Sequence, residues 1–109
     1  MPYNSNSIYP DVLRSIDSAT LTGSYQQVGA NLTNPARIIK FTNLSTVTVT
    51  ISWDGINDHE ILPTGGFVLL DISTNKETSQ ILEISANTPF FVKGSAGTGL
   101  IYISNYFAR

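Results

Sequence analysis

An uninterrupted alternation of apolar and hydroxylated residues from Thr46 to Trp53 constrains this chain more than any other feature. Side chains of a β-strand point to opposite faces with a period of two, so this segment predicts a strand with two unlike faces. The apolar face consists of Val47, Val49, Ile51 and Trp53, and the hydroxylated face consists of Thr46, Thr48, Thr50 and Ser52. Such a strand needs a second layer over its apolar face, which the rest of the chain has to supply.

The rest of the chain contains short apolar or alternating segments separated by turn residues. Its 109 residues suffice for one domain with a single core. Regular turn spacing without a long helix predicts an all-β domain, a single antiparallel two-sheet β-sandwich of about eight strands with Ig-like or jelly-roll topology. Besides the alternating segment, the expected strands are 19–28, 37–42, 58–62, 67–72, 80–85, 89–93 and 99–107.

Four features of these segments carry further expectations. The short link Asn43–Ser45 predicts that strand 37–42 and the alternating segment form a hairpin, and the glycine-rich stretch Gly94–Gly99 predicts a second hairpin loop. The continuous apolar run Phe67–Ile72 is typical of a strand buried on both sides or under a loop. Gly23 predicts a bulge or bend within strand 19–28.

Residues 1–18 have little pattern and predict an extended N-terminal arm before the sandwich domain of residues 19–109. Asp11–Ile16 is compatible with one helical turn. The arm has more apolar anchors than a free tail needs, so it packs either on a neighbouring subunit or along its own domain. These anchors, and therefore our first interface candidates, are Tyr3, Ile8, Tyr9, Leu13 and Ile16.

Composition excludes several function classes. Charged residues make up only 13% of the chain and the net charge is −2, which does not fit binding to nucleic acid. We expect no signal peptide, membrane span or basic amphipathic helix, because no segment has the required apolar or basic pattern. The absence of cysteine excludes disulfides, thiolate metal sites and a cysteine nucleophile.

The cluster from Asp54 to Glu60 is the most suggestive for chemistry. A structural turn is the favoured interpretation, because Asp-Gly and Asn-Asp are typical turn sequences. The weaker alternative is a Ca²⁺ site formed by Asp54, Asn57 and Asp58, since oxygen ligands at short spacing suit this ion. His59 is the only histidine, and we interpret it as exposed and structural. No nucleophile and base pair is recognisable, so we expect a binding or structural module without a catalytic site or cofactor.

Two further surfaces are interface candidates. Tyr102 and Tyr106 share one face of the last strand with Leu100 and Ser104, and this face is either core or an interface. The hydroxylated face of the alternating segment is flat and uncharged, so Thr48 and Thr50 are candidates for contact with a neighbouring protein. Trp53 shares its face with apolar residues and is expected in the core.

The run from Ser18 to Phe107 resembles a group of small virion structural proteins of tailed bacteriophages. The resemblance lies in residues 35–43, 49–59, 62–71 and 91–99. It implies a β-sandwich subunit, made in the host cytoplasm and incorporated into the virion, with no enzymatic activity and no cofactor. The implied partners are major capsid proteins, for a decoration or cement protein, or neck proteins, for a head-tail connector, and we expect a homo-oligomer. The alternative is a carbohydrate-binding sandwich of a tail fibre or receptor-binding apparatus, with the turn acids holding Ca²⁺ and a tyrosine stacking on sugar.

Overall fold

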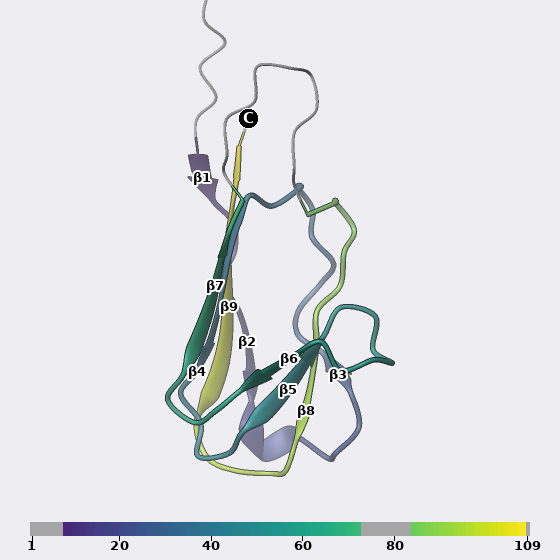
Figure 1. Cartoon of the computed structure of the whole chain (residues 1–109), viewed down its shortest axis with the longest axis vertical. Coiled ribbons are helices and arrows are strands. Elements are labelled where there is room, and N and C mark those ends of the chain that lie inside the picture. Colours follow the sequence, from purple (N-terminus) through teal and green to yellow (C-terminus); the bar gives the residue numbers. More distant parts are fainter. Residues whose placement is uncertain (1–7, 73–83, 109) are drawn as a thin grey trace, which may run out of the picture.

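The computed structural model describes residues 8–72 and 84–108, which form two antiparallel β-sheets packed face to face (Figure 1). The larger sheet has the strand order β1-β9-β4-β7, and β2 also pairs with β9. Its strands are β1 (Ile8–Pro10), β2 (Arg14–Asp17), β4 (Ile38–Asn43), β7 (Phe67–Asp71) and β9 (Leu100–Ala108). The predicted all-β sandwich is thereby confirmed.

The smaller sheet has the strand order β3-β8-β5-β6. Its strands are β3 (Gln26–Gln27), β5 (Val49–Ser52), β6 (Glu60–Leu62) and β8 (Phe91–Gly94), and a 3-10 helix, η1 (Ser18–Thr20), precedes β3. The regular strand β5 is shorter than the alternating segment that predicts it. Val47 and Trp53, just outside β5, nevertheless pack against the core as the alternation predicts.

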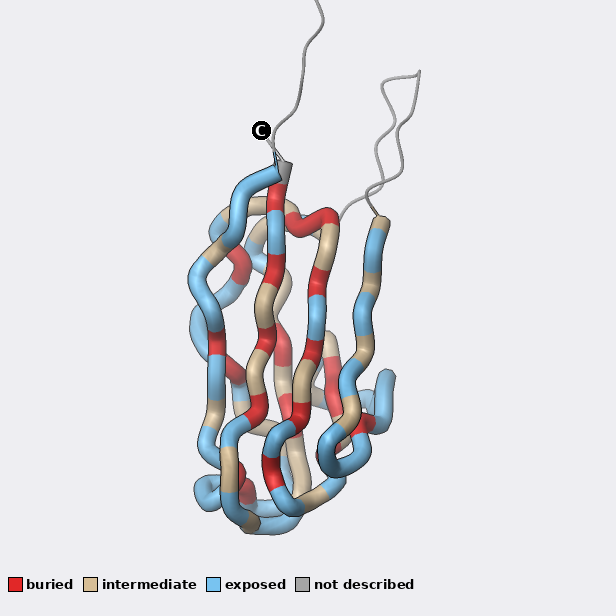
Figure 2. Tube along the Cα trace, turned by 90° about the vertical axis from the view of Figure 1, so that its left-hand side faces the viewer, coloured by how far each residue is buried: buried red, intermediate tan, exposed pale blue. Residues whose placement is uncertain are grey.

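The core fills the space between the two sheets. Along β4 and β9 buried residues alternate with more exposed ones, because every second side chain points inward (Figure 2). Three aromatic rings meet edge to face at its centre: the centroid of Phe90 lies 5.7 Å from that of Phe41 and 5.3 Å from that of Trp53. Phe41 belongs to the larger sheet and the other two flank strands of the smaller one, so this cluster joins the sheets.

The predicted hairpin between residues 37–42 and the alternating segment is wrong, because β4 and β5 lie in different sheets. Both strands have an apolar face, and placing them in opposite sheets lets these faces cover one another. The link is held by Asn43, whose buried amide donates to the carbonyls of Val47 (2.8 Å) and Leu62 (3.0 Å). Its Oδ1 accepts the backbone N–H of Ser45 at 2.9 Å.

The glycine-rich stretch 94–99 also crosses between the sheets instead of closing a hairpin, since β8 and β9 lie on opposite sides of the core. Gly99 has a φ of +102°, and a Cβ there would lie 2.5 Å from the carbonyl oxygen of Leu44. A side chain at this position would therefore be strained and would push the two crossing links apart.

Residues 8–17 pair with β9 of their own chain, so the described part of the expected arm adds two strands to the larger sheet. The helical turn considered for 11–16 is replaced by β2. Arg14 of β2 is buried and donates from Nη1 to Asn105 Oδ1 (2.9 Å) and from Nε to the Ala30 carbonyl (3.0 Å). Residues 1–7, with Tyr3, lie outside the described residues.

Other strand predictions need correction. Of the expected strand 19–28 only β3 is regular, and Gly23, with a φ of +86°, lies in a bend before it. The apolar run Phe67–Ile72 is not buried on both sides; it forms β7 at the edge of the larger sheet, with every second side chain exposed. Residues 80–83 of the expected strand 80–85 lie outside the described residues, and Ile84 forms an isolated bridge with Ala36.

Candidate functional site

The turn after β5 is organised by the carboxylate of Asp54. Its Oδ1 accepts the backbone N–H groups of Ile56 (2.8 Å) and Asn57 (2.9 Å), and its Oδ2 accepts the side-chain amide of Asn57 at 2.9 Å. The hydroxyl of Ser52 also donates to Oδ1, at 2.9 Å. The backbone bonds from Asn57 and Ile56 contribute most to holding the pKa of Asp54 far below its ordinary value. This geometry agrees with the turn interpretation.

A polar cluster of Tyr25, Asp58 and Lys93 lies beside this turn on the outer face of the smaller sheet. The hydroxyl of Tyr25 donates to Asp58 Oδ1, and Lys93 Nζ lies 3.0 Å from the same oxygen. Lys93 Nζ also lies 4.7 Å from the centroid of the Tyr25 ring. The hydrogen bonds from Tyr25 and Lys93 lower the pKa of Asp58. Partial burial, followed by the bond to Asp58, raises the pKa of Tyr25 to about 12.

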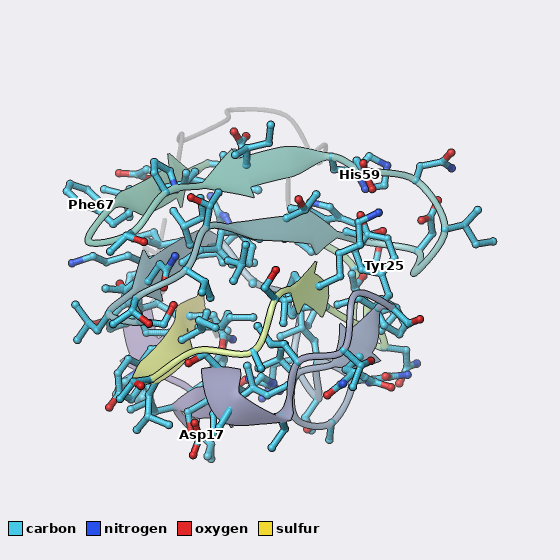
Figure 3. The ribbon with its side chains drawn as sticks, turned by 90° about the horizontal axis from the view of Figure 1, so that it is seen from below. Asp17, Tyr25, His59 and Phe67 are labelled. Atoms are coloured by element: carbon cyan, nitrogen blue, oxygen red, sulfur yellow. The ribbon has the colours of Figure 1, made fainter. Side chains whose placement is uncertain are left out.

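His59 has the structural role expected of it. It is exposed, and its side-chain Nδ1 accepts the backbone N–H of Trp53 at 3.0 Å. The backbone N–H of His59 donates to the Ile51 carbonyl at 2.9 Å. When neutral, it therefore carries its proton on Nε2. Figure 3 shows Tyr25 and His59 on the same side of the molecule, opposite to Phe67.

The candidate Ca²⁺ ligands Asp54, Asn57 and Asp58 bond mainly to protein groups. Asp54 binds Asn57, and a cation at Asp58 would compete with Lys93. No group of three or more His, Cys, Asp or Glu side chains suited to a metal gathers within residues 8–72 and 84–108. The hydroxyl of Tyr25 is protonated near neutral pH, as in any tyrosine, and acts as the hydrogen-bond donor to Asp58.

The outer face of the larger sheet has a different character. Strand register places Tyr106 beside Ile38, and Thr42 between Tyr102 and Phe67. Phe67 and Leu69 of β7 are 62% and 53% exposed. Within the described part of the chain, the hydroxyls of Tyr102 and Tyr106 have no hydrogen-bond partner. We call this surface the outer apolar face; it consists of Ile38, Phe67, Leu69, Leu100, Tyr102 and Tyr106.

The structure separates the predicted interface residues. Tyr102 and Tyr106 lie on the outer apolar face, which answers the choice between core and surface for them. Thr50 lies on the opposite sheet, where it pairs with Lys93, and Thr48 immediately precedes β5, so that face is not uncharged.

The N-terminal candidates differ among themselves. Ile16 is half-buried and packs against the core of its own chain, so it is not a surface anchor. Tyr9 stacks on Phe107 with centroids 5.8 Å apart and remains partly exposed. Ile8 and Leu13 are exposed. The sequence did not point to Phe67 or Leu69, because a continuous apolar run does not show which side faces solvent.

No protein-family model matches this chain, and neither a curated protein nor a solved structure matches it. The described residues contain no helix long and apolar enough to cross a membrane. Functional inference therefore depends on the two outer faces. The polar cluster consists of groups that satisfy one another, although Ile61 of the same sheet is exposed. The outer apolar face presents aromatic and aliphatic side chains to solvent around the exposed Lys40. We take the outer apolar face as the candidate functional site.

Proposed function

We propose that this protein is a non-catalytic structural component of a bacteriophage particle that binds other virion proteins through its outer apolar face. The observation that carries the proposal is the exposure of Phe67 and Leu69, neighbours on the outer side of β7, and of Tyr106 two strands away on the same sheet face, with Ile38 and Lys40 of β4 between them. Soluble monomers seldom expose contiguous apolar patches, and such patches mark contact sites. Aromatic residues are enriched in protein interfaces because they bury a large area with few rotatable bonds.

The resemblance to small virion proteins supports the choice of partner. Its segments 35–43 and 62–71 include β4 and β7, which form half of the outer apolar face. The proposed partners are major capsid proteins or neck proteins, and the protein acts as a homo-oligomer in either place. A low content of charged residues suits a particle component whose surface is largely covered by neighbours.

Particle incorporation tests the proposal. Tyr106→Arg would place a charge in the outer apolar face, and Thr48→Arg places the same charge on the exposed part of the opposite sheet. Each variant is supplied as the only copy during phage growth, and purified particles are analysed by quantitative mass spectrometry. We expect Tyr106→Arg to be lost from particles and Thr48→Arg to be retained. Equal incorporation of both variants, or absence of the wild-type protein from particles, would overturn the proposal.

The copy number of the wild-type protein then separates the two locations. A value comparable to that of the major capsid protein indicates decoration, and a small fixed number indicates the neck. The carbohydrate-binding alternative has less support, because Asp54 and Asn57 bond to each other and Lys93 covers one face of the Tyr25 ring. Tyr102 and Tyr106 lie on the sheet opposite to those acids.

A further inference from the structure

We infer that β7 is a self-association site at which two copies of the chain pair antiparallel across a two-fold axis, joining their larger sheets into one continuous sheet. This inference goes beyond the proposed function and does not depend on it. The strands at the edges of the two sheets have one side that is not paired within the described chain. An edge strand is a ready template for another strand unless charge, proline or shortness protects it.

The other edges are protected. β1 has three residues and ends in Pro10, and β2 contains Arg14 and Asp17. β3 has only two residues. β6 has three residues, begins with Glu60 and is followed by a proline. β7 has five residues, of which the first four are apolar and uncharged, and in the described chain no strand pairs with its outer side.

The backbone of β7 directs hydrogen-bonding groups to this open side. In an antiparallel ladder, successive residues point their N–H and C=O groups alternately to the two neighbours. Asn43 donates its N–H to the Gly66 carbonyl at 2.9 Å, which sets the phase of the β4–β7 ladder. Val68 and Leu70, paired with Phe41 and Ile39, therefore point their backbone groups toward β4. Those of Phe67 and Leu69 point to the open edge.

Charge favours a second copy of the same chain as the occupant. Lys40 Nζ lies 5.0 Å from the centroid of the Phe67 ring, at one end of β7, and Asp71 is at the other end. A two-fold axis at Leu69 places Phe67 of one copy opposite Asp71 of the other, with Cα atoms about 5.5 Å apart. Each Lys40 then stands beside the carboxylate of the other copy. A carboxylate accepts several hydrogen bonds, so the contact does not require Asp71 to lack other partners.

The same register pairs apolar groups on both faces. Leu69 meets its own copy on the outer face, and Val68 meets Leu70 of the other copy on the inner side. Val68 and Leu70 are only half-buried in the isolated chain although they pack against the core. Pairing would cover their exposed parts, and an interface that repeats the same residues on both copies is self-complementary.

Sedimentation equilibrium on the full chain tests this inference. The wild-type protein should have twice the 11.8 kDa mass of one chain at high concentration. Leu69→Lys should raise the dimer dissociation constant by about tenfold or more, which corresponds to about 1.4 kcal/mol. Leu44→Lys is the matched control, since Leu44 is 60% exposed but lies in the link after β4, and it should dimerise like the wild type.

A charge exchange tests the register without removing the apolar strand. Lys40→Asp should weaken the dimer, and Lys40→Asp combined with Asp71→Lys should restore it. The inference is overturned by a wild-type monomer at high concentration, by dimerisation of Leu69→Lys equal to the wild type, or by no restoration in the exchanged pair. A monomer that is still incorporated into particles would overturn this inference and the homo-oligomeric state, and would leave the proposed role as a virion structural protein intact.

Discussion

The outer faces of the two sheets differ although their inner faces share one core. On the smaller sheet, polar side chains satisfy one another: Asp58 binds both Tyr25 and Lys93, and Asp54 binds the turn that follows β5. On the larger sheet, Phe67 and Leu69 meet solvent.

This contrast indicates which surface gains more from a partner. A group that is already bonded within its own chain gains little from a new contact, because any new bond replaces an existing one. An exposed apolar ring gains free energy whenever a partner removes it from water. The larger sheet, which exposes Phe67 and Leu69, therefore has more to gain on association than the smaller sheet, where Ile61 is exposed beside satisfied polar groups.

The largest effect is expected from the same truncation placed inside and outside the sandwich. Phe90→Ala should destabilise the fold by about 3–5 kcal/mol, because it leaves a cavity between Phe41 and Trp53. Phe67→Ala on the outer apolar face should change stability by about 0.5 kcal/mol or less, since the ring is already in water. Urea unfolding of the monomer measures both values. Comparable losses would mean that Phe67 is covered within its own chain.

The second largest effect is expected at the link that places the two sheets on opposite sides of the core. Asn43→Ala leaves the buried carbonyl of Leu62 without its amide donor and removes the acceptor for the Ser45 N–H, so it should cost about 2–3 kcal/mol. Thr42→Ala, on the outer side of the same strand, should cost about 0.5 kcal/mol. The urea midpoints of the two variants compare their free energies of unfolding, provided that the m-value is unchanged. An Asn43 variant as stable as the Thr42 variant would contradict the role of this amide.

A smaller effect should appear in the pH dependence of the polar face. The pKa of Asp54 is lower in the folded chain than in the unfolded chain, so its stabilising contribution is complete above the ordinary value of about 3.9. It is lost as the pH falls through the folded pKa, where the carboxylate takes up a proton and releases the turn. Urea midpoints measured from neutral to acidic pH should fall less steeply in Asp54→Asn than in the wild type. An identical slope in the two proteins would refute this assignment.

The smallest effect is spectroscopic. Tyr25 should ionise at about pH 12, two units above the ordinary value, and its contribution to stability is present below pH 10 and lost as the pH rises toward 12. Asp58→Ala should move the Tyr25 titration part of the way back, because the hydrogen bond disappears while partial burial remains. Tyrosinate absorbance, with Tyr25→Phe as the reference that identifies the signal, measures the midpoint. An unmoved midpoint would show that Asp58 has no part in the shift.

Local pattern predicted much of the fold and part of the site. The alternation around β5 correctly assigned Val49 and Ile51 to the core, and the run of acids and asparagine after Trp53 correctly indicated a turn. Tyr25 and Lys93 could not be linked to Asp58 in advance, because they are 33 and 35 residues away in the chain and no motif joins them. Both hairpin predictions failed for a related reason: a short link fits a crossing between sheets as well as a turn within one.

Residue order alone predicts that this chain forms strands, which residues of an alternating strand face inward, and that cysteine chemistry is excluded. These properties depend on the period of the side chains along the backbone and on residue type, which are local. Only the tertiary structure decided which sheet each strand joins and which strand lies at an edge. Those outcomes depend on contacts between distant segments: β7 begins with four consecutive apolar residues, and its exposed side is set by β4, which covers one edge, and by the core, which covers one face.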